Sequence, residues 1–169
     1  NDAAEGHGTA ITLTAADFVP YYTYTGDLAV AGTVGPMTTA GTTQTFTWAL
    51  TGVDPDCANG AGTAGNSCGI HIHAGSSCTT DAGGHYYDSG TLTADPWATV
   101  VYTTGVGSLT VETGLAAADI NGRAMIIHNK DGGRVACAIL GAVTPITLTA
   151  AGFAPYYTYT GDLAVGGTV

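Results

Sequence analysis

A segment of 24 residues occurs twice in this chain. Residues 11–34 and residues 146–169 are identical at 21 of 24 positions, at an offset of 135 residues. A match of this length indicates a true internal repeat rather than shared composition. The chain of 169 residues therefore holds one full period and the opening of the next, as expected for a piece cut from a tandem array. One period is long enough for a single domain with a real core.

The period consists of short runs of Val, Ile, Thr and Tyr that Gly, Asp and Pro interrupt. This pattern predicts an all-β fold. We expect strands at residues 22–30, 43–50, 69–73, 97–102, 108–111, 123–128 and 134–141, a tight turn at 129–133, and a loop or a single helical turn at 113–119. Seven or eight short strands at this spacing predict a sandwich or a flattened barrel.

The chain is strongly acidic, with a net charge of −10 and only three Lys and Arg residues. This balance argues against nucleic acid and against anionic membranes as partners, because both select basic surfaces. No apolar run reaches the roughly 18 residues that a membrane span needs. The sequence begins without Met and without a signal sequence, so we read it as a mature or excised piece.

Four cysteines, Cys57, Cys68, Cys78 and Cys137, predict two disulfides and an oxidising, extracellular or secreted location. Three pairings are possible. Cys57 and Cys68 bracket a loop of Gly, Asn and Ala, so a local bridge between them is natural. Cys78 and Cys137 would then tie the loop after His73 to a late strand.

The pair His71 and His73 lies on a short apolar run. If this run is a strand, both imidazoles point to the same face and form half of a metal site. The other half must come from His7, His85 or His128, of which His7 has no partner nearby and is read as a bystander. The alternative for His71 and His73 is a pair of surface histidines, since His-x-His alone is a weak signal.

Four motifs resemble the copper/zinc superoxide dismutase family in order and spacing, over residues 21–143: GIHIH at 69–73, Gly84-His85, GRAMIIH at 122–128 and RVAC at 134–137. The resemblance implies an eight-stranded Greek-key β-barrel or sandwich, with His71, His73, His85 and His128 as copper ligands, Arg134 as the site arginine and Cys78–Cys137 as the disulfide. Four imidazoles also suit Cu(II) on chemical grounds.

The resemblance implies catalytic roles for two of these residues. His85 matches the bridging histidine of the family, which releases copper on reduction and can supply a proton. Arg134 would hold the superoxide anion beside the metal, because a guanidinium is always charged and donates in a fork.

Two departures from the family pattern modify this expectation. The zinc loop is cut down, so we expect no zinc; Asp88 falls where the zinc aspartate would be, and we expect it either to accept a hydrogen bond from His85 or to be a turn residue. Only residues 129–133 replace the long electrostatic loop, which predicts weaker guidance of the substrate. Arg123, Lys130 and Arg134 still form a local positive spot that could steer an anion, although Lys130 is equally explained as solubilising a turn.

Loss of both loops, an extra Cys57–Cys68 pair and tandem repetition together resemble the copper-only superoxide dismutase repeat proteins. We therefore expect residues 1–20 to be a leader or linker, 21–143 a copper domain that dismutates superoxide, and 144–169 a linker and the first strand of the next repeat. One alternative is a structural module that assembles head-to-tail into a filament, with residues 156–169 exchanged into a neighbouring copy. Another is copper binding or storage without turnover.

Overall fold

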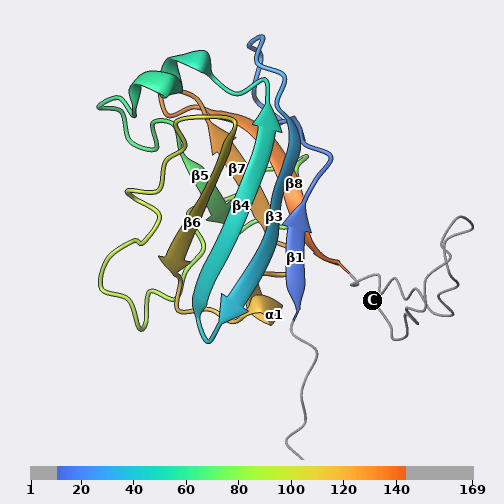
Figure 1. Ribbon diagram of the computed structural model, residues 1–169, viewed down its shortest axis with the longest axis vertical. Helices are drawn as coiled ribbons and strands as arrows, with labels where there is room; N and C mark the ends of the chain where they lie inside the picture. The colour runs from blue at the N-terminus through green and yellow to red at the C-terminus, as the bar shows by residue number, and fades with distance from the viewer. Residues whose placement is uncertain (1–10, 144–169) are drawn as a thin grey trace, which may run out of the picture.

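The computed structural model describes residues 11–143, which form eight β-strands and two short helical segments (Figure 1). The strands are β1 (Thr12–Ala15), β2 (Val19–Pro20), β3 (Ala31–Ala40), β4 (Thr43–Thr51), β5 (Ile70–His73), β6 (Val106–Glu112), β7 (Ala124–His128) and β8 (Arg134–Val143). The helical segments are a 3-10 helix, η1 (Pro55–Asn59), and a single α-helical turn, α1 (Ala117–Ile120). The expectation of an all-β fold is confirmed.

All strand pairs are antiparallel, and the order across the sheet is β5-β7-β8-β1-β3-β4-β6, with β2 also pairing with β8. Figure 1 shows the sheet curled, with β6, β4 and β3 in front and β5 and β7 behind them. Strand β1 lies between β3 and β8, and its first residue, Thr12, pairs with the last residue of β8, Val143. The two ends of the described chain therefore meet at one place.

The two halves of the curled sheet differ in how they are covered. Strand β4 alternates, with Phe46, Trp48 and Leu50 buried in the core and Thr47 and Ala49 between them exposed. This is the pattern of a strand with one face in water. Every residue of β5 and β7 is buried, because loops cover the outer face of this half of the sheet. The buried half carries the candidate functional residues.

Two expected strands are absent. Residues 22–30 form turns and loop because the hydroxyl of Tyr24 accepts a hydrogen bond from the Leu28 N–H (3.1 Å) across Gly26 and Asp27, and the strand begins only at Ala31. Residues 97–102 form turns, with one isolated bridge between Val101 and Gly69. In both places local side-chain hydrogen bonds compete with the strand propensity of Tyr, Thr and Val.

The expected domain boundary at residue 20 is wrong. Strand β1 lies before it and pairs on both sides, with β3 and with β8, and its residues Leu13 and Ala15 are fully buried. The repeated segment 11–34 therefore contains β1, β2 and the start of β3 rather than a single strand. The expectations for residues 1–10 and 144–169, including His7, the linker and the strand exchange, fall outside the described residues.

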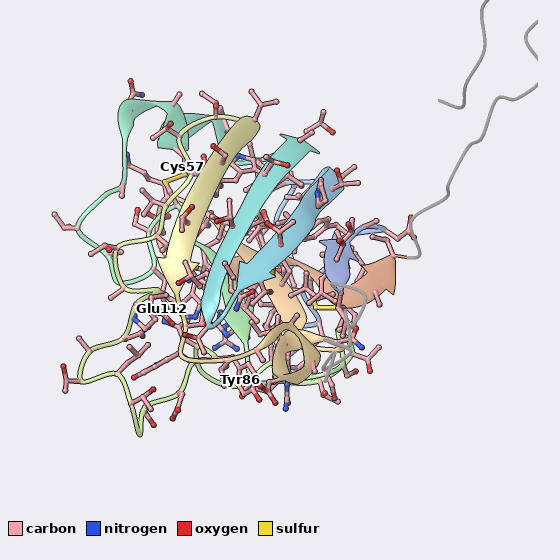
Figure 2. All side chains as sticks on the ribbon, turned by 60° about the horizontal axis from the view of Figure 1, so that its bottom comes forward. Cys57, Tyr86 and Glu112 are labelled. Carbon is pink, nitrogen blue, oxygen red and sulfur yellow. A yellow bond between two sulfur atoms is a disulfide. The ribbon has the colours of Figure 1, made fainter. Side chains whose placement is uncertain are left out.

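Two disulfides fasten loops to the sheet, and they are the pairs expected from the sequence. Cys57–Cys68 joins η1 to the residue pair that precedes β5, and Cys78–Cys137 joins the loop after β5 to β8. Figure 2 shows Cys57 at one end of the molecule, well away from Tyr86 at the other. Among the described residues, no helix has the length and apolar character to cross a membrane.

Candidate metal centre

Four histidines converge in the buried half of the sheet. His71 and His73 come from β5, and His128 ends β7. His85 lies in the loop between β5 and β6, where it forms a β-bridge with His73. One ring nitrogen from each lies within 4.8 Å of the others. These are the four residues that the motif spacing selected, and they are close enough to bind a metal ion.

The second nitrogen of each imidazole is fixed by an oxygen acceptor. The pairs are His71 Nε2 with Val100 O (2.8 Å), His73 Nδ1 with Gly83 O (2.9 Å), His128 Nδ1 with Gly132 O (3.0 Å) and His85 Nδ1 with Asp95 Oδ2 (2.6 Å). Because carbonyl and carboxylate oxygens only accept, each of these nitrogens carries the hydrogen. The lone pairs therefore sit on Nδ1 of His71 and on Nε2 of the other three, which face the common centre.

Burial keeps the imidazoles of His71, His73 and His128 neutral. It is the largest cause that lowers the pKa from 6.5 to about 2 for His71, about 3 for His73 and about 4 for His128, and the positive charge of neighbouring groups lowers each pKa further. His71 Nδ1 and His85 Nε2 are buried with no hydrogen-bond partner among the described residues. His73 Nε2 and His128 Nε2, both lone-pair atoms in these tautomers, face each other at 3.4 Å. A cation at the centre would satisfy all four nitrogens, so the donor set fits a metal ion.

Two glycines make this geometry possible. A Cβ on Gly69 would lie 2.3 Å from the His71 ring, so only glycine admits the ring there. Gly132, whose carbonyl accepts from His128, has φ of +79° and lies in the left-handed region; a Cβ there would lie 2.0 Å from the carbonyl oxygen of Gly65.

An open cleft of about 330 Å³ leads to the cluster. It is lined by His73 and His85 together with Asn66, Gly84, Asp95 and Arg134. The Arg134 guanidinium donates from Nη2 to the carbonyl of Gly83 (2.5 Å), the same oxygen that accepts from His73 Nδ1. One peptide oxygen thus fixes the arginine relative to a histidine of the cluster. The guanidinium of Arg134 therefore lies on the cleft beside the histidine cluster, where it can meet a small anion at contact.

The other two cations do not line this cleft. Lys130 Nζ donates to the carbonyls of Asp56 and Gly60, and Arg123 donates to the carbonyl of Ala74 (2.6 Å). The Arg123 guanidinium also stacks 4.2 Å from the ring centre of Tyr86, which Figure 2 shows at the end of the molecule near α1. Both side chains brace loops, so of the positive spot expected from the sequence only Arg134 faces the site.

The hydrogen bond that we expected Asp88 to accept from His85 is made by Asp95 instead. Asp88 is the turn residue of the two expected alternatives, since its carboxylate accepts from the Gly90 N–H (2.9 Å) and the Thr91 hydroxyl (3.0 Å). Asp95 Oδ1 also accepts from the Trp97 N–H (2.9 Å), which fixes the carboxylate. Asp95 lies ten residues after His85 in the sequence, but the loop folds back and brings its carboxylate to the His85 ring.

Two further residues at the site were not expected from the sequence as site residues. Tyr21 and Asp81 both accept from Arg134 Nη1, at 2.7 Å each. The sequence separations are 113 and 53 residues, and no local pattern connects positions so far apart.

In the comparisons with known proteins, neither the models of protein families nor the curated proteins gave a match.

Proposed function

We propose that this chain is an extracellular module that binds one copper ion and no zinc, and that dismutates superoxide to oxygen and hydrogen peroxide. The observation that carries the proposal is the convergence of four imidazole nitrogens, while the other nitrogen of each ring is hydrogen-bonded to an oxygen acceptor. The proposed ligands are His71, His73, His85 and His128. The two disulfides are compatible with the extracellular location.

The donor set favours copper over other metals. Nitrogen sites bind Cu(II) more tightly than the other divalent first-row metals, and Cu(II) accepts tetragonal nitrogen coordination. A copper ion held here would supply one-electron chemistry by alternating between Cu(II) and Cu(I). Zinc does not change oxidation state, and no carboxylate of the described residues joins the four nitrogens in the cluster.

Arg134 and His85 supply what the anion needs from the protein. Arg134 lies on the cleft and offers a fixed positive charge that binds superoxide and orients it towards the histidines. His85 is the proposed proton-carrying group, because the Asp95 carboxylate at Nδ1 fixes the ring and leaves Nε2 facing the centre. Two superoxide anions and two protons give one oxygen and one hydrogen peroxide, so a proton-carrying group beside the anion serves the second half of the reaction.

The strand order supports a Greek-key fold like that of the superoxide dismutases. Strands β1, β3 and β4 pair in succession, and the last strand, β8, returns to lie beside β1. A late strand beside the first of a paired run is a feature that a Greek key shares, and it supports this part of the proposal. Strand β6 pairs with β4 while β5 pairs with β7, so the chain crosses between the two halves of the sheet.

The test is metal content together with superoxide decay on the purified chain. We expect one copper and no zinc per chain, rapid decay, and a weak dependence on salt because a single arginine supplies the guidance. His71→Gln should lose copper and activity together, whereas substitution of the exposed Asp27 by Asn should change neither. Copper uptake without faster decay of superoxide would refute the proposed dismutase activity and would indicate a protein that binds or stores copper.

A structural role is the second candidate, and the repeat favours it. Residues 146–169 repeat almost exactly the sequence of the segment 11–34, which in the described domain contains β1, β2 and the start of β3. A module that carries a second set of these strands can offer them to a neighbouring copy and assemble head-to-tail. Copper would then be incidental or structural.

A further inference from the structure

The guanidinium of Arg134 is held by three acceptors, and one of them carries a negative charge. Nη1 donates to the Tyr21 hydroxyl and to Asp81 Oδ1, both at 2.7 Å, and Nη2 donates to the Gly83 carbonyl. Asp81 belongs to the loop that Cys78–Cys137 fastens to β8, the strand that begins with Arg134. The only cation on the cleft thus forms an ion pair.

Tyr21 fixes the position of this pair. It is 4% exposed, and its hydroxyl accepts from the Ala82 N–H and donates to Asp81, both at 3.1 Å. Its own N–H donates to the Val135 carbonyl at 3.0 Å, one residue beyond Arg134. The Arg134 guanidinium also lies 5.4 Å from the ring centre of Tyr21. A buried residue held by these side-chain and backbone contacts is a rigid support for a partly exposed arginine.

Asp81 acts on the charge rather than on the position. Hydrogen bonds from the Gly83 N–H, the Tyr21 hydroxyl and Arg134 lower the pKa of Asp81, which is therefore ionised at neutral pH. Its side chain is 68% exposed, so it faces the same solvent from which an anion arrives. At a distance from the ion pair, the negative charge of Asp81 offsets the positive charge of Arg134. An anion is therefore attracted only when it contacts the guanidinium.

We propose that Tyr21 and Asp81 are positioning residues that set the anion affinity of the cleft in opposite directions. Tyr21 raises the affinity by holding Arg134 beside the histidines, and Asp81 lowers it by offsetting the charge of Arg134. This inference rests on the proposed function, since it concerns the anion path of the same site. The charge offset by Asp81 makes the cleft selective for anions small enough to reach the guanidinium, and it weakens the attraction of anions over longer distances.

The experiment is an azide titration of the copper-loaded chain of 169 residues, read from the charge-transfer absorption of the copper–azide complex. Asp81→Asn keeps an oxygen acceptor and removes one charge, so azide should bind about threefold more tightly at low salt. The gain should vanish near 1 M salt, where the Debye length falls to about 3 Å. Tyr21→Phe keeps the buried ring and removes one support, so azide should bind at least about threefold more weakly at every salt concentration.

The control is Asp27→Asn, which removes the same charge from an exposed residue that forms no hydrogen bond or ion pair with other described residues; azide affinity should stay within experimental error. Equal effects of Asp81→Asn and Asp27→Asn, or a loss of affinity in both Asp81→Asn and Tyr21→Phe, would overturn the inference. Azide binding is measured without turnover, so a copper protein that fails to dismutate superoxide refutes the proposed function and leaves this test standing.

If the chain takes up no copper, the readout is the rate at which phenylglyoxal modifies Arg134 in the metal-free protein. Both variants should speed the modification, and an unchanged rate would refute the positioning roles.

Discussion

At the scale of single residues, Asp95 and Asp88 offer a matched pair. Asp95 holds Nδ1–H of His85 with a charged oxygen at 2.6 Å, whereas Asp88 only closes a turn in the same loop. Asp95→Asn should lower the copper affinity roughly ten- to hundredfold, because the carboxylate fixes the tautomer and the orientation of the ring. Asp88→Asn should leave the affinity unchanged. Competition with a chelator of known affinity measures both, and equal affinities in the two variants would contradict the role of Asp95.

The buried imidazoles predict how the metal-free protein responds to acid. In the unfolded chain His71, His73 and His128 take up protons near pH 6.5, while in the fold the pKa values of these groups are lowered to about 2, 3 and 4. The unfolded state therefore binds more protons below pH 6.5, and stability is lost as the pH falls from there towards 4. Each histidine contributes up to about 1.4 kcal/mol per pH unit. Urea unfolding at pH 7 and pH 5 tests this, and His128→Gln should give a shallower slope. Equal midpoints at the two pH values would refute it.

At the scale of elements, the loop between β5 and β6 depends on its disulfide. Cys78–Cys137 anchors the segment whose Gly83 carbonyl accepts from both His73 and Arg134. Replacing both cysteines by serine opens a loop closed over 59 residues and should cost about 4 kcal/mol of stability. It should also weaken copper binding, because the carbonyl is no longer fixed.

The other disulfide is the control for that experiment. Cys57–Cys68 closes a separation of 11 residues, so its removal should cost about 3 kcal/mol, and the Gly83 carbonyl keeps its place. Urea unfolding and a copper competition assay on both double variants separate stability from affinity. A larger loss of copper affinity on removing Cys57–Cys68 would contradict the role given to the loop after β5.

The elements that the sequence predicted well are those whose pattern is local. Strand β4 alternates, β5 and β7 are short apolar runs next to histidines, and the turn at 129–133 carries Asp-Gly. Strands β1 and β2, with four and two residues, are too short to show a period, and they are defined by their pairing with β8. The same division holds at the site. His-x-His is readable from spacing, whereas the contacts of Asp95, Asp81 and Tyr21 depend on how loops fold back.

At the scale of the whole molecule, the repeat predicts that the mass of the assembly in solution depends on residues 146–169. If residues 146–169 insert into a neighbouring copy, the full chain should form a ladder of oligomers on a native gel and in light scattering, and a chain ending at residue 145 should be monomeric. The ladder should grow with concentration, because the contact is head-to-tail and does not close. Monomers in both samples would exclude strand exchange between copies.

The pairing of Thr12 with Val143 has a consequence for an array of such modules. Between Val143 and Ile146, the counterpart of Ile11, the chain can span only about 10 Å, so successive copies would be tethered almost at one point. Strand β8 runs from Arg134 to that tether, a length of roughly 30 Å for its ten residues. Arg134, which lines the cleft, would thus lie at the end of β8 away from the tether. Crowding at the tether would then fall at the opposite end of β8 from this arginine.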